Sequence, residues 1–585
     1  MRLRWLGRVP YEEAHELQRA LRDADQPRDG YVLMLEHPHV VTVGLRGDMS
    51  HVLADPATIG SLGGKVVRTD RGGDVTYHGP GQMVVYPIVD VPKGPRSIPC
   101  FVHQVEQIVI DAIGQLGRDA GLAGFAGRVG RLADYPGVWV DPHGPDPKKI
   151  CAIGIRVSRG RSMHGIALNV SPDMEWFSRI VPCGITDKGV TSLALEGVNC
   201  SMAEVADAIA TQAVSAWAPD GEYDRQDVAG LHPVPSPLIM APAFVSPDVA
   251  ARAVAAPDVV SPAPGASAKI RLRQAGVDPD AGVPMRERKP QWLRAPVVMG
   301  DRFRNLGRTM RDLGLVTVCE EAGCPNIYEC WADGTATFMI NGERCTRACG
   351  FCLVDTRHPM PIDPEEPVKV AEAVEKMGLA YAVVTAVARD DMPDGGAEAF
   401  AATIRAIRER CPGTSVEVLI PDCKGNGEAL DLIFAERPEV LNHNLETVAR
   451  LQRAVRPSAG YARSLAVLAR AAKAGLVVKS GIILGMGETT GEVRAALVDL
   501  RAVGVSIVTI GQYLRPSAKH IPVARWVTPE EFEELGEFGR NLGFDHVESS
   551  PLTRSSYHAK AAMESANGVG GQSAVPVEFV VRRGA

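Results

Sequence analysis

Short apolar runs rich in β-branched residues recur through the first part of the chain. Each is bounded by Gly, Pro or Asp, as strands usually are. The runs lie at residues 31–37, 39–44, 82–90, 137–141, 149–158 and 164–170. Apolar residues recur at helical spacing over 102–116, and Ser201 with Glu204 predicts a capping box before a second helical pattern at 203–217. This part of the chain is predicted to be an α+β domain, with a mostly antiparallel sheet and helices on one side.

Strands and helices alternate regularly in the last part of the chain. Its apolar runs lie at 335–340, 381–388, 414–422, 438–445, 477–487, 506–514 and 545–549, with helical stretches between them. Such alternation indicates parallel βαβ units. In a barrel of these units the active site lies at the C-terminal ends of the strands.

A segment rich in proline separates the two patterns. Residues 232–265 contain eight prolines, one aromatic residue and three charged residues. This many prolines is incompatible with a continuous helix or a central strand. We therefore predict a multidomain chain: a domain at 1–222, an extended Pro/Ala-rich linker at 223–282, and a domain at 283–585 whose barrel spans about 331–550.

Length, composition and charge narrow the class of protein. A chain of 585 residues exceeds the usual domain of about 100–200 residues. The net charge of −7 argues against a general attraction to nucleic acid. The N-terminus lacks the apolar core of a signal peptide, and no apolar run reaches about 18 residues. We expect a cytoplasmic protein without a nucleic-acid or membrane partner.

Cysteine is unevenly distributed, and six of the twelve cysteines form two triplets with the spacings C-x4-C-x5-C and C-x3-C-x2-C. The triplets are Cys319, Cys324, Cys330 and Cys345, Cys349, Cys352. A cubane cluster needs four ligands, so three thiolates leave one iron open to a further ligand. The spacing predicts two [4Fe-4S] clusters.

Three other uses of these cysteines are disfavoured. A structural zinc site usually closes with paired C-x2-C knuckles or histidines, and neither triplet does so. A disulfide framework is disfavoured because the thiols of a cytosolic protein stay reduced. An iron–sulfur scaffold or sensor without catalysis would normally bind its clusters through cysteines alone.

The second triplet resembles the signature of radical S-adenosylmethionine enzymes. Its pairing with the first triplet, and the segment RERKPQWLR at 286–294, resembles lipoyl synthase. The resemblance implies a partial (β/α)6 barrel, two [4Fe-4S] clusters, S-adenosyl-L-methionine, and insertion of sulfur at carbons 6 and 8 of a protein-bound octanoyl chain. An unactivated C–H bond is not acidic, which is why such a reaction requires radical cofactor chemistry.

The same resemblance implies further ligands in the C-terminal domain. A serine of the Arg554-Ser-Ser-Tyr segment would complete the cluster of the first triplet, which is consumed as the sulfur donor. We assign this role to Ser556, with Ser555 as the alternative. The glycine-rich turn DDMPDGGAE and the segment NHNLET provide candidate neighbours of the cofactor or substrate, Gly395, Gly396 and Asn442.

Three segments of the N-terminal domain together resemble the lipoyl(octanoyl) transferase family of the biotin/lipoate protein ligase superfamily. They are RGGDVTYHGPGQ at 71–82, KKICAIGIRVSRGRSMHGIALNV at 148–170 and VPCGI at 181–185. The match extends over most of residues 1–218. It implies a substrate pocket formed by Arg71, Gly72, Gly73, Asp74, Val75, Thr76, Tyr77, His78, Ala152, Ile153, Gly154, Gly165, Ile166 and Ala167.

The chemistry expected of this domain needs an activated thiol. Acyl transfer between two carriers is easiest through a covalent thioester, in which cysteine serves as both nucleophile and leaving group. A nearby cation, Lys149 or its neighbour Lys148, would favour the thiolate. The resemblance places the nucleophile at Cys183 and the acid/base lysine at Lys149. An ATP-dependent lipoate or biotin ligase is the alternative, but such a ligase would need no cysteine.

Together the resemblances imply a fused bifunctional enzyme of lipoate assembly. It would transfer octanoyl from octanoyl-acyl carrier protein to a lysine of a lipoyl domain and then insert two sulfurs. The implied acceptors are lipoyl domains of 2-oxoacid dehydrogenases and the glycine-cleavage carrier protein. A fusion in which one half has become a docking module is disfavoured by the presence of Cys183, Lys149 and both triplets.

Overall fold

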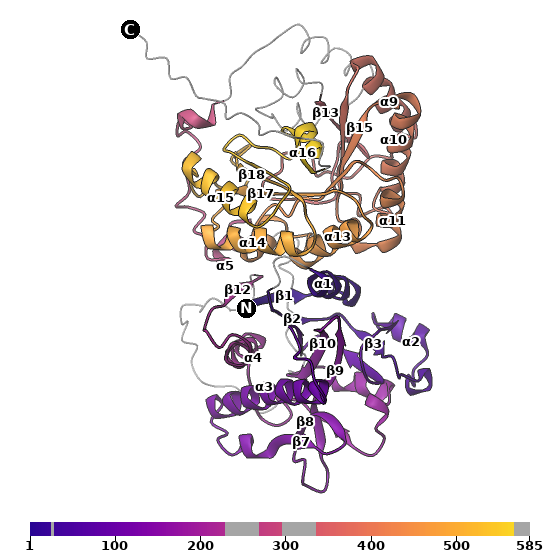
Figure 1. Ribbon diagram of the computed structural model, residues 1–585, viewed down its shortest axis with the longest axis vertical. Coiled ribbons are helices and arrows are strands. Elements are labelled where there is room, and N and C mark those ends of the chain that lie inside the picture. Colours follow the sequence, from indigo (N-terminus) through magenta and orange to yellow (C-terminus); the bar gives the residue numbers. More distant parts are fainter. Residues whose placement is uncertain (25–28, 229–267, 295–334, 567–585) are drawn as a thin grey trace, which may run out of the picture.

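The computed structural model describes residues 1–24, 29–228, 268–294 and 335–566. The described residues form two lobes, one from residues 1–228 and one from residues 268–566 (Figure 1). Cys319, Cys324 and Cys330 lie outside the described residues. Within the described ranges, no helix has both the length and the apolar character needed to cross a bilayer.

A nine-stranded sheet forms the centre of the N-terminal lobe, in the order β12-β1-β2-β6-β10-β9-β8-β7 with β11 paired to β9. Its strands are β1 (Arg2–Arg8), β2 (Tyr31–Glu36), β6 (Gln82–Ile88), β7 (Val129–Leu132), β8 (Tyr135–Val140), β9 (Lys148–Ser158), β10 (Arg161–Asn169), β11 (Gly189–Val190) and β12 (Asp224–Asp227). Pairing is antiparallel from β2 through β7, while β1 runs parallel to β2 and β12. The prediction of a mostly antiparallel α+β domain is confirmed.

Helices cover both faces of this sheet, so the expectation of helices on one side was wrong. The helices are α1 (Tyr11–Asp23), α3 (Ser97–Asp119) and α4 (Met202–Trp217). Val32 and Met34 of β2 pack with α3 and α4, whereas Leu33 and Leu35 pack with α1. Successive side chains of a strand point to opposite faces, and every residue of β2 is buried. A strand apolar on both faces therefore needs two covering layers. The predicted capping box of Ser201 is present at the start of α4.

A smaller three-stranded sheet stands beside the main one, in the order β4-β3-β5. Its strands are β3 (Val40–Val43), β4 (Lys65–Arg68) and β5 (Val75–His78). Val41, Val43, Val75 and Tyr77 form a compact core with Trp176. The loop from β4 to β5 carries Arg71, so this small sheet places the predicted glycine-rich segment next to β9 and β10.

The C-terminal lobe contains a parallel sheet of seven strands in sequential order. They are β13 (Thr335–Ile340), β14 (Tyr381–Ala386), β15 (Ser415–Leu419), β16 (Val440–Asn442), β17 (Val478–Leu484), β18 (Ile507–Gln512) and β19 (His546–Ser549). The helices between them are α9 (Glu366–Met377), α10 (Ala397–Arg410), α11 (Gly427–Ala435), α12 (Gln452–Val455), α13 (Tyr461–Lys473), α14 (Thr490–Ala502) and α15 (Pro529–Asn541). Among the described residues, β13 and β19 each pair on one side only, so the barrel is partial, as predicted, with a seventh strand beyond the expected six.

The final helix of the described range lies on the face of the sheet opposite the outer helices. Ala382 and Val384 of β14 pack with the main helical core, whereas Tyr381 and Val383 pack with Ala559 of α16 (Ala559–Ala566). The period-two alternation of β14 thus separates an outer helical layer from an inner face. The inner face is where a barrel of this type holds its site.

The two lobes are joined through a buried ionic contact. The Arg4 guanidinium donates to both oxygens of Asp499, at 2.7 and 3.0 Å. The hydroxyls of Tyr31 and Tyr461 donate to the same carboxylate at 3.1 and 2.9 Å. Only 2–3% of the Arg4 and Asp499 side chains is exposed, so water does not screen the pair. The donors to this carboxylate come from both lobes, so it lies in the interface between them, which is called the seam below.

Apolar packing surrounds this contact. Leu17 and Leu21 of α1 belong to the same buried cluster as Leu465 and Leu468 of α13. Figure 1 shows α1 and β1 facing the row of helices that includes α13 and α14. The lobes therefore share a continuous core, and contact between them does not depend on the segment of the chain that links them.

Both ends of the expected linker contain ordered elements. β12 pairs with β1 of the main sheet, although it lies past residue 222. At the other end, α5 (Ala268–Gln274) packs Leu272 into the shared core. The segment expected to be a linker, 223–282, therefore includes a strand at one end and a helix at the other. The dense proline pattern lies only between these two elements, at 232–265.

Replacing Asp499 tests whether its buried contact with Arg4 stabilises the interface between the lobes. Asp499→Asn leaves the buried Arg4 with Asp224 as its single carboxylate partner, so we expect a loss of about 3 kcal/mol in the free energy of unfolding. Lys473→Gln is the matched control, because Lys473 is 64% exposed and pairs across the seam with Glu16 at 3.6 Å. An exposed pair of this kind contributes about 0–1 kcal/mol. The measurement is urea unfolding of both full-length variants; equal midpoints would contradict the assignment.

Candidate functional site

A narrow pocket opens in the N-terminal lobe between α1, β5, β9 and β10, and it encloses about 340 Å³ including its open mouth. Its walls are formed by Tyr11, Arg71, Thr76, His78, Tyr86, Ala152, Ile153, Gly154, His164, Gly165, Ile166 and Ala167. The structure thus brings most of the sequence-predicted substrate residues together. Tyr11, Tyr86 and His164 were not among them. Tyr11 belongs to α1, and no local motif identifies it as a pocket residue.

The predicted residues that do not line the pocket follow the alternation of β5. Thr76 and His78 face the pocket, whereas Val75 and Tyr77 point into the small core. The Tyr77 ring stacks on Trp176 with centroids 5.3 Å apart. A motif read as a continuous stretch cannot separate the two faces, but a strand with period two does so. Gly72, Gly73 and Asp74 lie in the loop just before this strand.

Arg71 fixes the shape of that loop. Its guanidinium donates to the carbonyl of Thr42 at 2.6 Å, to the carbonyl of Asp74 at 2.6 Å and to the carbonyl of Gly72 at 3.1 Å. Burial lowers the pKa of Arg71. The side chain therefore supports the pocket wall through backbone contacts.

The glycines of the pocket permit close backbone packing. A Cβ on Gly165 would lie 2.1 Å from the carbonyl oxygen of Val85, and one on Gly154 would lie 2.9 Å from that of Gly72. Contacts this short would force neighbouring backbone to move. Glycine at both positions is therefore a packing requirement of the pocket wall.

Cys183 and Lys149 lie next to each other. The Lys149 Nζ is 3.6 Å from the Cys183 Sγ. Cys183 occupies a short 3-10 turn (Pro182–Gly184) with a φ of +57°, a left-handed conformation that few non-glycine residues adopt. Lys149 is 6% exposed, and its Nζ lies 4.8 Å from the centre of the Trp139 ring.

Lys148 is on the opposite face of β9 and pairs with Asp146 at 3.5 Å. Strand alternation therefore selects Lys149 from the two adjacent lysines.

Asp74 supports the turn that carries Cys183. It accepts hydrogen bonds from the Asp48 backbone at 3.0 Å and from the His51 ring. A Cβ on Gly184, whose φ is +70°, would lie 2.9 Å from the Asp74 carboxylate. The turn thus rests on the Asp74 and His51 pair. This places the predicted substrate residue Asp74 beneath the cysteine turn, outside the pocket lining.

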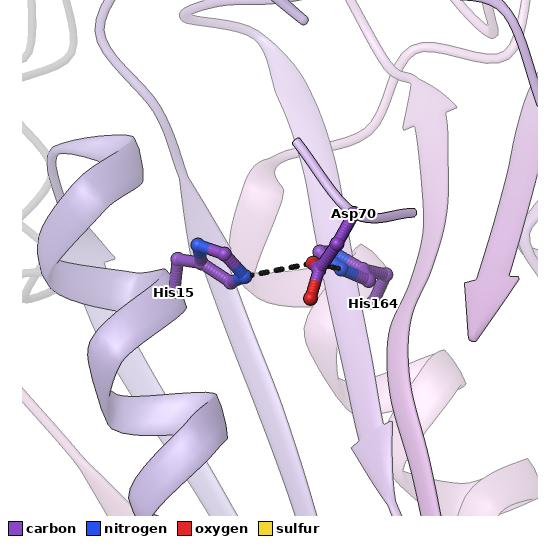
Figure 2. A group of neighbouring side chains, drawn as sticks. All are labelled: His15, Asp70 and His164. Carbon is purple, nitrogen blue, oxygen red and sulfur yellow. Dashed lines mark hydrogen bonds and ion pairs between the residues drawn. The ribbon is translucent and has the colours of Figure 1, made fainter. Parts of the chain in front are cut away.

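A second polar cluster includes His164 of the pocket wall. Figure 2 shows His15 and His164 pointing at Asp70, and their Nε2 atoms donate to the same carboxylate oxygen at 2.9 and 2.8 Å. Arg156 also binds Asp70. The hydrogen bond from His164 holds the pKa of Asp70 well below its usual range, although burial opposes this. Burial lowers the pKa of His15 to about 4 and also lowers that of His164.

This cluster links α1 to the pocket wall. Its ligand atoms lie within 4.8 Å of one another, a spacing that a metal ion could use. However, Arg156 occupies the carboxylate, and Arg19 lies 3.9 Å from it. Two guanidinium groups oppose the binding of a cation, so the cluster acts as a hydrogen-bonded clamp between α1 and β10. Sequence motifs do not reveal His15, because its partners lie on other elements.

In the C-terminal lobe, the described cysteine triplet lies in the loop after β13. The Cys345 sulfur accepts hydrogen bonds from the backbone N–H groups of Arg347 and Ala388, at 3.4 and 3.3 Å. The loop is tied down by Gly350, whose N–H donates to Val455 at 2.8 Å. Ala388 follows β14, so the triplet sits at the C-terminal ends of the strands.

Gly395 and Gly396 form the turn that begins α10, with φ values of +64° and +87°. A Cβ on Gly396 would lie 2.3 Å from the Asn341 amide nitrogen, which donates to the Gly396 carbonyl at 3.2 Å. The Asn341 Oδ1 has no hydrogen-bond partner among the described residues. The turn is therefore adjacent to a buried acceptor at the end of β13.

Asn442 is buried at the end of β16, inside a polar network that the sequence did not reveal. Its Nδ2 donates to Glu417 at 3.1 Å, and Glu417 pairs with Lys479 at 3.0 Å. The Tyr381 hydroxyl also donates to Glu417, at 2.9 Å. Glu417 and Lys479 are fully buried, which is stable because each charge is paired and hydrogen-bonded.

The serine segment contacts the end of β18 and also Asn444, which follows β16. The Ser550 N–H donates to Ile510 at 3.2 Å, and Asn444 donates to the Ser555 hydroxyl at 2.6 Å. Within the described ranges, the Ser556 hydroxyl makes no hydrogen bond. The two adjacent serines are therefore inequivalent: one is already engaged and the other is available.

Known family models match parts of both lobes. The family model described as the lipoyl protein ligase A/B catalytic domain matches residues 10–214. The radical SAM superfamily matches residues 339–500, and the N-terminal domain of lipoyl synthase matches residues 274–324. The lipoyl synthase of Mycobacterium ulcerans (strain Agy99) is 56% identical over 280 residues, covering 48% of this chain and 86% of that protein.

The chain belongs to the lipoyl synthase family. Its N-terminal lobe is in addition a catalytic domain of the lipoate ligase and transferase type. The lipoyl synthase of Mycobacterium tuberculosis (strain ATCC 25177 / H37Ra) is 55% identical over 280 residues, covering 48% of this chain and 90% of that protein.

Among solved structures, lipoate-protein ligase A bound with ATP is 19% identical, with a TM-score of 0.31, and covers 38% of this chain and 89% of that one. Methylornithine synthase is 12% identical, with a TM-score of 0.29, and covers 44% of this chain and 80% of that one. At these scores the structural likeness adds nothing to the family assignment.

Membership of the lipoyl synthase family implies iron–sulfur clusters and S-adenosylmethionine. The residues after β13 fit a cluster. Burial raises the pKa of Cys352 to about 12 and also raises that of Cys349, so the thiolates need the positive charge of iron to be stable there. N–H groups that donate to sulfur, as at Cys345, also stabilise a bound cluster.

Acid should destabilise the N-terminal lobe through its buried histidines. Burial lowers the folded pKa of His15 and of His37 to about 4, below the unfolded value of about 6.5. Between these values the unfolded chain binds more protons, so stability falls as the pH drops through this window. His15→Gln should show a shallower loss than wild type in urea unfolding at about pH 7 and about pH 5. His103→Gln, at an exposed position, is the control and should follow wild type.

Proposed function

We propose that the chain is a bifunctional enzyme that transfers an octanoyl group to a lipoyl domain and then inserts two sulfur atoms into it. The observation that carries the first activity is the 3.6 Å approach of Lys149 to Cys183. The Cys183 turn packs on β5, whose Thr76 and His78 line the pocket. A buried ammonium beside a thiol favours the thiolate, which is the form that attacks a thioester.

Two half-reactions follow from this pair. The Cys183 thiolate attacks the thioester carbonyl of octanoyl-acyl carrier protein, and the carrier thiol leaves with a proton from Lys149. The lysine amine of the lipoyl domain then attacks the Cys183 thioester. Lys149, now neutral, accepts the proton of that amine, and Cys183 leaves as the thiolate. Atoms and charge balance over the two steps, and no ATP is consumed.

An ATP-dependent ligase is the second candidate for this lobe, because the matching family model includes ligases and transferases. A ligase forms an adenylate and needs no reactive cysteine. The strained Cys183 turn would then have no catalytic role. The approach of Lys149 to Cys183 therefore favours the transferase.

Substitution of this pair should stop the first reaction alone. Cys183→Ala should abolish octanoyl transfer, and Lys149→Met should slow it by about 100- to 10,000-fold, the usual contribution of an acid–base group. Lys148→Met is the matched control, since it removes the adjacent lysine that faces away. Transfer to a lipoyl domain is followed by intact mass. Sulfur insertion into a supplied octanoyl-domain should continue in all three variants. ATP-dependent transfer by Cys183→Ala would indicate a ligase instead.

For the C-terminal lobe we propose two [4Fe-4S] clusters and S-adenosyl-L-methionine. Cys345, Cys349 and Cys352 would bind the cluster that cleaves S-adenosylmethionine. The Gly395 and Gly396 turn, together with the buried amides of Asn341 and Asn442, provides polar contacts at the strand ends. When bound, these cofactors supply the radical that removes hydrogen from an unactivated carbon.

Cys319, Cys324, Cys330 and Ser556 would bind the second cluster. Ser556 is preferred to Ser555 because its hydroxyl makes no hydrogen bond within the described ranges, whereas Asn444 engages Ser555. A serine oxygen holds iron less tightly than a thiolate, which suits a cluster that gives up sulfur.

Partners and location follow from this chemistry. The proposed donor is octanoyl-acyl carrier protein, and the proposed acceptors are lipoyl domains of 2-oxoacid dehydrogenases and the glycine-cleavage carrier protein. We place the enzyme in the cytoplasm, where cysteines stay reduced.

The two serines provide a direct test of the second cluster. Ser556→Cys should retain about eight irons per chain and the cleavage of S-adenosylmethionine, but it should suppress sulfur insertion. Ser555→Ala is the matched control and should still form lipoyl product. The measurements are iron and sulfide analysis after anaerobic reconstitution and mass spectrometry of the carrier. Wild-type product formation by Ser556→Cys would exclude Ser556 as the ligand.

A further inference from the structure

A line of four charged side chains crosses the seam between the lobes and ends at the cysteine loop. Glu13 of α1 accepts from the Arg463 Nε at 2.7 Å. The Arg463 guanidinium lies 3.8 Å from Asp422, and Asp422 accepts from Arg347 at 2.5 Å. Arg347 stands between Cys345 and Cys349 in the sequence. The first domain thus reaches the surroundings of the proposed radical cluster through side-chain contacts.

Arg347 anchors the cysteine loop to the barrel. Its guanidinium binds both oxygens of Asp390 at 2.8 Å as well as one oxygen of Asp422. Its backbone N–H donates to the Cys345 sulfur at 3.4 Å. The side chain is only 6% exposed. A shift of this guanidinium would therefore move the backbone that donates to a cluster ligand.

Arg347 binds only one of the two carboxylate oxygens of Asp422. Burial opposes its ionisation, but attraction to Arg347 lowers its pKa to about 2, so the group is a carboxylate. Its Oδ1 binds Arg347, while its buried Oδ2 has no hydrogen-bond partner among the described residues. The nearest cation on that side is Arg463, and 3.8 Å is too long for a hydrogen bond. A buried carboxylate oxygen without a donor strongly attracts a nearby guanidinium.

Glu13 is the second acidic partner of Arg463. It binds the Arg463 Nε from the other side of the seam, and only 10% of its side chain is exposed. Its carboxylate lies over Gly425, where a Cβ would come within 2.6 Å of the Glu13 oxygen. The φ of Gly425 is +75°, which glycine adopts without strain. The Arg463 guanidinium therefore lies between two carboxylates, and in this structure it donates to Glu13.

We propose that Glu13, a residue of the acyl-transfer domain, is a positioning residue of the radical site. By holding Arg463 away from Asp422, it leaves Asp422 to fix Arg347 beside Cys345. This inference rests on the proposed function of the C-terminal lobe. Glu13 acts through three other side chains and touches neither substrate nor cofactor.

The test is Glu13→Gln in the reconstituted full-length protein. The loss of charge should release Arg463 to the free oxygen of Asp422 and loosen Arg347. Cleavage of S-adenosylmethionine should fall by about 10-fold, the scale expected for a displaced positioning group. The change that S-adenosylmethionine causes in the electron paramagnetic resonance spectrum of the reduced protein should also be altered. Octanoyl transfer should stay within about twofold of wild type, because Glu13 does not line the pocket.

Glu16→Gln is the matched control. Glu16 lies on the same helix and pairs across the same seam with Lys473, but it has no contact with Asp422. It should leave both the cleavage rate and the spectrum unchanged. An equal defect in Glu16→Gln would show that Glu13 acts only by holding the lobes together.

The double variant Glu13→Gln/Arg463→Gln separates competition from simple support. With Arg463 replaced, no guanidinium competes for Asp422, so cleavage and the spectrum should return toward wild type. A double variant as defective as Glu13→Gln, or a Glu13→Gln protein that matches wild type in both readouts, would overturn the proposal. Wild-type protein that fails to bind iron or cleave S-adenosylmethionine would instead refute the proposed function.

Discussion

The buried carboxylate of Asp499 is the constraint on which the arrangement of the two lobes depends. Its oxygens are removed from water, so they must find donors within the protein. Arg4 and Tyr31 of the first lobe supply three of these hydrogen bonds, and Tyr461 of the second supplies another. A charge buried in this way is stable only when both lobes are in place. The pair therefore specifies one orientation of the lobes, while the surrounding leucines supply apolar burial.

Helix α1 lies in this seam and contributes side chains to the acyl pocket and to the interface with the C-terminal lobe. Tyr11 and His15 on one face belong to the acyl pocket and its polar clamp. Glu13 and Leu17 on the other face contact the barrel. Residues four apart share a helix face, which is how one helix of ordinary length can present two unrelated surfaces. A change in the packing of α1 would consequently reach both sites.

In the proposed function, this arrangement changes how the carrier must behave. The sequence predicted an extended linker between the two domains. The shared core holds the two sites in one body instead. The octanoylated carrier then has to move between them. Any advantage of the fusion would depend on the separation and orientation of the two openings.

The sequence by itself determined the features that depend on local pattern. Periodicity predicted the parallel C-terminal strands, the Ser201 and Glu204 pattern predicted the capping box of α4, and spacing identified the cysteine triplets. Cys183 and Lys149 were predicted through the family resemblance of the segments around them. Only the tertiary structure decided that Lys149 and not Lys148 faces Cys183, and that β2 needs a second covering layer. The ionic contacts of the seam join residues about 450 to 500 positions apart, such as Arg4 with Asp499 and Glu13 with Arg463. Partners so distant in the chain meet because two folded surfaces pack together, and no local sequence pattern carries that information.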